Sequence, residues 1–326
     1  MIIAIVGATG LVGRTMLKIL QEYGYLNNNQ IILYASAKSA GTTINIGEHR
    51  FCIQELTKKN IDPNISFALF SAGSQISKQW AKEFTKNGTV VIDNSNAFRR
   101  FKSIPLIVPE INMDTVNLKN KIIANPNCST IGLCVAIESL IKASPIKRII
   151  VSTYQAVSGA GNNALLDLQN NSAKKFIYPI ANNLLPHIDN FLPSGYTKEE
   201  DKLMFEISKI FRIKIPISAT AVRVPITNCH SESVNIEFAK PITITQVKNV
   251  LSTSCGVTLL DDQKNNLYPM PLVADNTNQV FVGRIRKDPT HKNTYNLFLS
   301  FDNLRKGAAL NAVQIMKAYI EKFFYK

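Results

Sequence analysis

Cys128 is the side chain best placed for nucleophilic chemistry. It lies in Asn125-Pro126-Asn127-Cys128-Ser129-Thr130, between an apolar stretch at 122–124 that predicts a strand and an apolar run at 131–141 that predicts a buried helix. A thiol on the first turn of a helix faces backbone N–H groups and the positive end of the helix dipole, which favour the thiolate. A free thiol with a pKa of ~8.5 is only roughly 3% ionised at neutral pH, so a lower pKa would make the nucleophile abundant. The alternative is a small buried hydrophobic residue.

A glycine turn near the N-terminus indicates a dinucleotide site. Gly7, Gly10 and Gly13 directly follow an apolar run at 2–6 that predicts a strand, and apolar residues then recur at helical spacing at 16–20. Glycines in such a turn allow a diphosphate to approach the backbone, and the helix N-terminus attracts its charge. A turn with a purely structural role is the alternative interpretation.

The second predicted strand, at 31–35, indicates which dinucleotide binds. No Asp or Glu follows it to hold a ribose 2′-hydroxyl, and Ser36, Lys38 and Ser39 stand there instead. A cation between two hydroxyls suits a 2′-phosphate, so NADP is favoured over NAD. A solvated turn lysine would give the same pattern.

The elements that must position these residues alternate between strand and helix. Further strands are predicted at 67–72, 90–93 and 122–124, with helical segments such as 76–84 between them. This alternation predicts an α/β fold with an N-terminal, Rossmann-type, doubly wound parallel sheet. Ligands bind outside the carboxyl ends of such strands, so we expect residues 71–73, Asn94, Ser95, Arg99 and Cys128 to line one crevice.

The second half predicts a different architecture. Longer strands at 148–157, 217–224, 233–238 and 295–301 indicate a largely antiparallel sheet in an α+β domain. We expect residues 1–127 to form an NADP-binding domain and residues 128–303 a second, catalytic domain, with a helix at about 304–326 packing back on the first. Residues 180–197 predict a long loop in which His187 is structural.

Composition narrows the class of protein. The 326 residues carry a formal charge of +14, but the basic residues are scattered and form no nucleic-acid motif, so nucleic acid is not expected as the main partner. Five dispersed cysteines without CxxC pairs argue against a disulfide framework or a metal site, and no apolar stretch reaches membrane-spanning length. We therefore expect a cytoplasmic protein that binds neither metal nor membrane.

Several longer motifs resemble one enzyme family in order along almost the whole chain. They are Gly7-Ala8-Thr9-Gly10-Leu11-Val12-Gly13, Ser36-Ala37-Lys38-Ser39-Ala40-Gly41, the Cys128 motif, Tyr154-Gln155-Ala156-Val157-Ser158-Gly159-Ala160-Gly161, Arg223-Val224-Pro225 with His230-Ser231-Glu232-Ser233, and Asp302-Asn303-Leu304-Arg305-Lys306-Gly307-Ala308-Ala309. Together they resemble the aspartate-β-semialdehyde dehydrogenases.

The resemblance implies that NADPH reduces L-4-aspartyl phosphate to aspartate semialdehyde and phosphate, on the way to diaminopimelate, lysine, threonine and methionine. Cys128 would attack the acyl phosphate to form a thioester, and Gln155 would help to orient the acyl group. His230 would shuttle protons, for which an imidazole is suited. Arg223 would bind the substrate α-carboxylate as a planar fork of donors. The remaining substrate contacts would be Arg99 and Lys209 to phosphate and Glu206 to the ammonium group.

The residues expected to contact the cofactor are Gly7, Thr9, Gly10, Leu11, Val12, Ser36, Lys38, Ser39, Ser71, Ser158, Gly159 and Asn303. The resemblance also implies a homodimer, with a tetramer as the alternative, and residues 128–303 as the dimerisation domain. Two other functions stay open. N-acetyl-γ-glutamyl phosphate reductase shares the chemistry but has a different motif around its cysteine, and a non-catalytic NADP-binding sensor would keep only the cofactor fold. Taken singly, the two arginines could be surface ion-pair partners, Glu206 and Lys209 a plain helix pair, and His230 a turn histidine.

Overall fold

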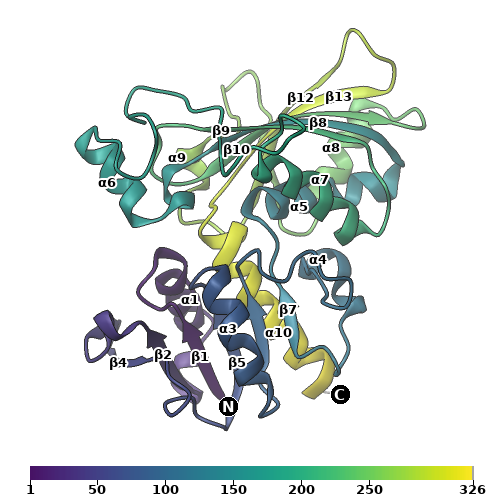
Figure 1. The fold of residues 1–326 in the computed structure, drawn as a ribbon. Coiled ribbons are helices and arrows are strands. Elements are labelled where there is room, and N and C mark those ends of the chain that lie inside the picture. The colour runs from purple at the N-terminus through teal and green to yellow at the C-terminus, as the bar shows by residue number, and fades with distance from the viewer. Residues whose placement is uncertain (325–326) are drawn as a thin grey trace. The chain divides into compact units, whose positions relative to one another are not determined.

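The computed structural model describes residues 1–324 and divides into two compact units. The first unit comprises Met1–Pro126 together with residues 308–324, and the second unit comprises Asn127–Gly307; the last two residues of the helix predicted at about 304–326 lie outside the described residues. The first unit holds strands β1 (Ile2–Val6), β2 (Gln30–Ala35), β3 (Thr43–Ile46), β4 (His49–Glu55), β5 (Ile65–Phe70), β6 (Val90–Asp93) and β7 (Ile122–Ala124). Its helices are α1 (Leu11–Glu22), α2 (Tyr25–Asn28), α3 (Ser74–Thr85), α4 (Pro109–Asn112) and α10 (Leu310–Phe324) (Figure 1).

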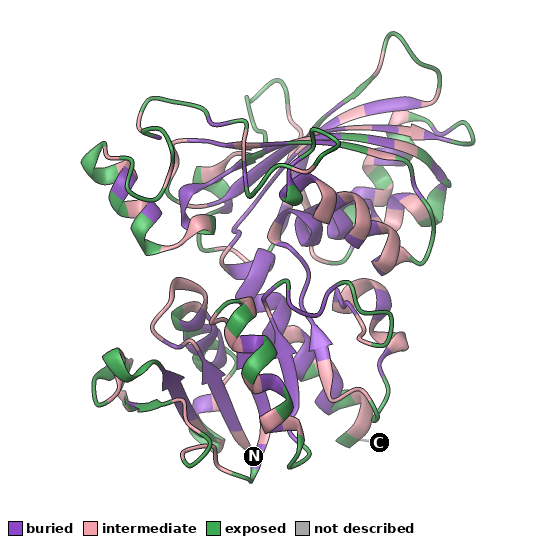
Figure 2. Ribbon diagram, viewed as in Figure 1, coloured by how far each residue is buried: buried purple, intermediate pink, exposed green. Residues whose placement is uncertain are grey.

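The first unit is built on a sheet whose strand order, within the described residues, is β3-β4-β2-β1-β5-β6-β7; all its pairs are parallel except the edge pair β3–β4, which is antiparallel. Both of its faces are covered. Phe67 on β5 packs against Tyr319 of α10 with ring centroids 5.6 Å apart. Phe70, three residues later on the opposite face, packs against Phe84 of α3 at 5.3 Å. The prediction of a doubly wound α/β sheet is confirmed, and Figure 2 shows that the central strands are buried.

The chain returns to the first unit through α10. Its buried residues, among them Ile315, Met316 and Tyr319, share one hydrophobic core with Ile3 and Ile5 of β1. The predicted apolar face of the C-terminal helix is therefore confirmed, although five residues at Arg305–Ala309 form a π-helical turn before the α-helix begins. Pairing of the polar hairpin β3–β4 was not predicted from the sequence, since its residues lack the long apolar runs of the other strands.

Asn125, at the carboxyl end of β7, forms hydrogen bonds with the residue that follows β6 and with two residues of the C-terminal segment. Its Nδ2 donates to Asn94 Oδ1 at 2.6 Å and to the backbone oxygen of Ala308 at 3.2 Å. Its Oδ1 accepts from Asn311 Nδ2 at 2.7 Å. The segment just before Cys128 is thus fixed by a buried side chain, and Ala308 lies beside it.

The second unit holds a mixed sheet with helices on one face (Figure 1). Its strands are β8 (Ile146–Gln155), β9 (Ile217–Arg223), β10 (His230–Phe238), β11 (Val257–Leu259), β12 (Val280–Lys287) and β13 (Thr294–Phe301). Its helices are α5 (Cys128–Ala143), α6 (Asn162–Asn170), α7 (Lys198–Phe211), α8 (Ile244–Ser252) and α9 (Pro271–Ala274).

The strand order of this sheet, within the described residues, is β11-β12-β13-β10-β8-β9. Its central pairs are antiparallel, as predicted, but β8–β9 and β11–β12 at its edges are parallel. Parallel neighbours need a crossover, and the long connection from β8 to β9 supplies one through α6 and α7. The segment between these helices contains isolated bridges but no named helix or strand, as expected for a long loop.

Within residues 1–324, every helix is too short or too polar to serve as a membrane span.

Candidate active site

Cys128 is the first residue of α5, and the helix begins there because Asn127 caps it. Asn127 Oδ1 accepts the backbone N–H groups of Ser129 at 3.0 Å and Thr130 at 3.4 Å. The sequence predicted open N–H groups around the thiol, whereas these two are occupied by the cap. The helix dipole remains, and Cys128 keeps an intermediate exposure while the helix behind it is buried.

His230 lies directly beside the thiol. Its Nε2 is 3.2 Å from Cys128 Sγ, and its Nδ1 accepts the backbone N–H of Ala156 at 3.1 Å. The imidazole is 0% exposed. Burial, reinforced by the positive charge of Arg223, lowers the pKa of His230 to about 3. The ring is therefore neutral at physiological pH.

Arg223 is the last residue of β9, and its guanidinium lies near the His230 ring. Its Nη1 donates to the backbone oxygen of Ala156 at 2.7 Å, while its buried Nε has no hydrogen-bond partner among the described residues. Burial lowers the pKa of Arg223, and the negative charges of Glu199 and Cys128 oppose that shift. A buried donor without a protein partner is costly, which makes it a fitting contact for a ligand oxygen.

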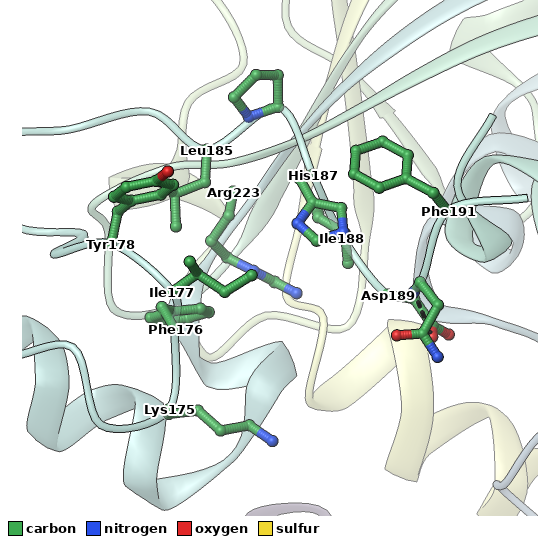
Figure 3. Close-up of a pocket in the computed structure, with 12 residues that line it drawn as sticks. Lys175, Phe176, Ile177, Tyr178, Leu185, His187, Ile188, Asp189, Phe191 and Arg223 are labelled. Carbon is green, nitrogen blue, oxygen red and sulfur yellow. Dashed lines mark hydrogen bonds between the residues drawn. The ribbon is translucent and has the colours of Figure 1, made fainter. Parts of the chain in front are cut away.

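A pocket of about 700 Å³ opens at Arg223. Figure 3 shows the Arg223 side chain between two stretches of the long loop, residues 175–178 on one side and residues 187–191 on the other. The walls are largely apolar, with Ile177, Tyr178 and Phe191 strongly exposed. His187, expected to be structural, stacks on Phe191 with ring centroids 4.3 Å apart.

Glu199 organises the charges of the site and was not predicted from the sequence. Its Oε1 accepts Nδ2 of Asn127 at 2.9 Å and Nε2 of Gln155 at 3.2 Å, and its Oε2 pairs with Lys202 at 3.0 Å. Burial would raise the pKa of Glu199, but Lys202 and the hydrogen bonds outweigh it, so the pKa is lowered. Because a carboxylate only accepts, the Gln155 amide must turn its nitrogen toward Glu199.

Glu206 and Lys209 follow on the same helix, α7. Glu206 is 1% exposed, and its Oε2 accepts the backbone N–H of Asn127 at 2.7 Å. Burial lowers the pKa of Lys209, and the charge of Glu206 opposes that shift. α7 is aligned for these contacts by a capping box between Thr197 and Glu200. The two buried acids thus approach Asn127 from one helix face.

Two glycines let the backbone come close to the reactive groups. A Cβ at Gly307 would lie 3.1 Å from the Cβ of Cys128, and one at Gly159 would lie 3.1 Å from Arg223 Nη1 and 3.4 Å from His230 Nε2. Ser158, next to Gly159, accepts from Asn303 Nδ2 at 3.0 Å. The three residues of the second unit that were predicted to contact the cofactor therefore lie around the thiol and its partners.

The first unit contains a separate pocket of about 450 Å³ at the carboxyl ends of its strands. The predicted residues Gly7, Thr9, Gly10, Ser36 and Ser71 line it. Leu11 and Val12 begin α1 beside it, and Lys38 and Ser39 lie in the short helical turn that follows Ser36. Glu55, Leu56, Ile76 and Trp80 also line the pocket and were not predicted, because β4 and the outer side of α3 gave no motif.

The glycine turn has the geometry that a dinucleotide requires. Gly7 has φ +89°, and a Cβ there would meet the backbone nitrogen of Ala72 at 2.8 Å. At Gly10, by contrast, a Cβ would only approach the Gly7 oxygen, at 3.5 Å, so the space beyond it is open. The first glycine serves the turn and the second keeps the backbone accessible to a ligand. Arg99 also lies in this unit, where its Nη2 donates to the Asn94 oxygen at 2.9 Å.

Cys229, Asp275 and Asp302 form a further group in which possible metal-ligand atoms lie within 4.8 Å of one another. Asp302 already accepts the backbone N–H groups of Leu304 and Arg305, both at 2.9 Å. Burial raises the pKa of Cys229, which keeps the thiol protonated. Asp302 therefore caps the turn that follows it.

Two family models match the chain. Residues 2–119 match the NAD binding domain of semialdehyde dehydrogenases, and residues 137–306 match their dimerisation domain.

Individual relatives match over nearly their full length. An aspartate-semialdehyde dehydrogenase of Aquifex aeolicus is 46% identical, with 98% of each chain covered. That of Bacillus subtilis is 43% identical, with 97% of this chain and 96% of the relative covered. The crystal structure of aspartate semialdehyde dehydrogenase II complexed with ASA, from Vibrio cholerae, matches with a TM-score of 0.95 at 39% identity over 99% of both chains. The chain belongs to the aspartate-semialdehyde dehydrogenase family.

Proposed function

We propose that this protein catalyses the NADPH-dependent reductive dephosphorylation of L-4-aspartyl phosphate to L-aspartate 4-semialdehyde and phosphate. The step serves the biosynthesis of diaminopimelate, lysine, threonine and methionine. One observation carries the proposal: a thiol at the first position of a helix lies 3.2 Å from a neutral imidazole. The sensor alternative would have no need of this pair, and the family match argues against N-acetyl-γ-glutamyl phosphate reductase.

Cys128 is the proposed nucleophile. Its sulfur attacks the acyl carbon, phosphate leaves, and a thioester remains on the enzyme. The helix dipole and the positive charge of Arg223 both favour the thiolate that this attack needs. Gln155, fixed by Glu199, is proposed to orient the acyl group.

Arg223 is proposed to bind the substrate α-carboxylate. Its buried Nε is without a protein partner among the described residues, and its Nη1 lies near Gly159, to which the His230 ring is also close. A carboxylate would satisfy this donor in a charge-assisted hydrogen bond. The Vibrio cholerae relative, solved with ASA, supports a site for a small amino-acid aldehyde.

The remaining substrate contacts rest on charge. Lys209 and Arg99 are proposed to hold the phosphate, and Glu206 the substrate ammonium group. Glu206 is buried next to the thiol helix, and its bond to the Asn127 backbone fixes its carboxylate there.

The first-unit pocket is proposed to hold NADP. Gly7, Thr9 and Gly10 would face the diphosphate, and Ser36, Lys38 and Ser39 the 2′-phosphate. Leu11, Val12 and Ser71 complete the first-unit contacts, and Ser158, Gly159 and Asn303 the proposed nicotinamide contacts. When bound, NADPH supplies the hydride that reduces the thioester.

We propose a cytoplasmic homodimer formed through the second unit. The dimerisation-domain match covers residues 137–306, and the sheet face opposite α5 exposes Ile150 and Tyr154. A tetramer is the alternative, and light scattering during gel filtration separates the two.

The deciding experiment is the reverse reaction, in which aspartate semialdehyde, phosphate and NADP are mixed with the purified protein. NADPH absorbance should rise only when all three are present. N-acetylglutamate semialdehyde in place of aspartate semialdehyde should give no product. Absence of NADPH formation, with NADP still bound, would instead support the sensor.

A further inference from the structure

Asp167 is a buried acid in the last turn of α6, and the proposed reaction makes no use of it. Its side chain is 1% exposed and lies three residues after the buried Ala164, so the two residues share the inward face of the helix. The negative end of the helix dipole disfavours a carboxylate in this turn. Other groups must therefore stabilise its charge.

Four hydrogen bonds supply that stabilisation. Asp167 Oδ1 accepts the Ser172 hydroxyl at 2.6 Å and the backbone N–H of Lys174 at 2.9 Å. Its Oδ2 accepts the backbone N–H groups of Lys175 at 2.6 Å and Phe176 at 3.1 Å. Burial would raise the pKa of Asp167, but these bonds outweigh it, so the pKa is lowered and the group is a carboxylate at neutral pH. Successive N–H groups that converge on one anion form a nest.

The segment that Asp167 holds has no secondary structure of its own. In the described part of the chain, no helix or strand lies between Asn170, where α6 ends, and Lys198, where α7 begins. The N–H groups of residues 174–176 donate to no backbone oxygen within residues 1–324. The position of this stretch of backbone therefore depends on the Asp167 carboxylate.

The same segment forms one wall of the pocket at Arg223. Residues 175–178 line the pocket, and Figure 3 shows them on one side of the Arg223 side chain. Within this wall, Phe176 packs against a small core that includes Val157 and Leu185. Leu185 and Arg223 exchange two backbone hydrogen bonds, of 2.8 and 3.0 Å. The wall and the strand end that carries the guanidinium are thus joined through one core.

Building on the proposed function, in which Arg223 binds the substrate α-carboxylate, we propose that Asp167 is a positioning residue for the substrate. It holds residues 174–176 in place, and the wall that they begin sets the space in which the substrate meets Arg223. Asp167 acts through backbone N–H groups and contributes no group to the reaction. Its loss should therefore weaken binding of the semialdehyde and spare both the thiol chemistry and the cofactor.

Asp167→Asn is the direct test. An amide has one acceptor oxygen, so in either orientation its NH₂ group faces at least one of the three backbone N–H groups, which then loses its acceptor. We expect the KM for aspartate semialdehyde in the reverse reaction to rise about tenfold and kcat to change less than about twofold. NADPH affinity, followed by the fluorescence of Trp80 in the cofactor pocket, should not change.

Asp288→Asn is the matched control. Asp288 lies in the connection between β12 and β13 and caps a turn in the same way. It accepts the N–H and the hydroxyl of Thr290 at 2.8 and 2.6 Å and Nδ2 of Asn235 at 2.7 Å. Both variants should lose stability to urea, but only Asp167→Asn should raise the semialdehyde KM. Equal KM values would show that Asp167 has a structural role alone and would overturn the proposal.

Ser172→Ala decides the question if Asp167→Asn does not fold. It removes a single donor and leaves the three backbone bonds, so we expect the semialdehyde KM to rise about threefold in a folded protein. In that case a KM equal to that of the wild type would reject the role of Asp167. The wild-type protein in the same assay separates the two proposals. Absence of turnover would reject the reaction and this role with it, whereas normal turnover with unchanged KM in the variants would reject the role of Asp167 alone.

Discussion

The cofactor pocket of the first unit and the thiol site of the second unit are built in opposite ways. The pocket is assembled from backbone and small side chains at the ends of parallel strands, and residues close in sequence, such as Gly7, Thr9 and Gly10, line it together. The thiol site is assembled from buried charged and polar side chains on different elements. Cys128, Glu199, Arg223 and His230 come from α5, α7, β9 and β10.

The difference shows what each site depends on. A glycine turn needs only the local conformation of the chain, so it functions wherever a strand runs into a helix. Buried charges need partners, because a charge without one costs several kcal/mol. The thiol site should therefore be sensitive to single changes of charge, and the cofactor pocket should tolerate them.

The largest effect should follow Cys128→Ser. A hydroxyl is far less acidic than a thiol, so the nucleophile is lost and kcat should fall by roughly 10³-fold or more. NADPH affinity should change less than about twofold if the two sites are independent. Trp80 is the single tryptophan of the chain and lines the cofactor pocket, so its fluorescence reports binding directly. The control is Cys52→Ser, at an exposed thiol in the first unit. Retained turnover would remove Cys128 from catalysis.

Arg223→Lys should come next. A lysine keeps the positive charge but cannot make the two parallel hydrogen bonds of a planar guanidinium. We expect this loss to weaken transition-state binding by about 2 to 3 kcal/mol, or roughly 30- to 150-fold in kcat/KM for the semialdehyde. We expect most of the loss to appear as a higher KM. Arg286→Lys, at an exposed position on β12, is the matched control. A KM equal to that of the control would place the substrate carboxylate elsewhere.

Glu199→Gln should change stability and its pH dependence. The pKa of Glu199 is lowered from its ordinary 4.5, so its contribution is present above about pH 4.5 and is lost as the pH falls through the folded-state pKa. The variant should unfold in urea with about 1 to 3 kcal/mol less free energy at pH 7, and with a weaker acid dependence. Glu321→Gln, which breaks a mainly exposed pair with Lys317, should change almost nothing. Equal urea curves for the two variants would contradict the contrast between the sites.

Lys38→Ala should have the smallest effect. Removing one solvent-accessible cation should narrow the preference for NADP over NAD by about tenfold, because the 2′-phosphate loses one charge-assisted contact of about 1.4 kcal/mol. Protein stability should not change. Lys119→Ala, at an exposed position in the same unit, is the comparison. If both variants show the wild-type cofactor ratio, another group must hold the 2′-phosphate.

Sequence patterns predicted the central strands of the first unit and its helices α1, α3 and α10. β1, β6 and β7 occur at the predicted residues, because short apolar runs between glycines and polar turns specify buried parallel strands. The hairpin β3–β4 escaped prediction because its alternation is weak and its side chains are mainly exposed. The parallel strand pairs at the edges of the second sheet were not predicted, because strand direction depends on the crossover connections and not on the strand residues themselves.

Prediction of the thiol site was limited by its dependence on tertiary contacts. Cys128 and His230 came from motifs, but Glu199 lies in an acidic run, Glu199-Glu200-Asp201, that is typical of an exposed helix start. Its burial follows from contacts with Asn127 and Gln155, which are 72 and 44 residues away in sequence. The hydrogen bond from the Ala156 backbone N–H to the His230 imidazole could not be predicted from the sequence, because any residue other than proline has this N–H.

The hydrogen bond between Asn125 and Ala308 bears on how this chain can be engineered. The whole of Asn127–Gly307 is a single insertion, and the bond from the Asn125 side chain to the Ala308 backbone joins the first unit's chain on either side of it. A few glycines joining Pro126 to Ala308 would thus close a continuous nucleotide-binding module with its own core, and this module could be expressed and titrated alone.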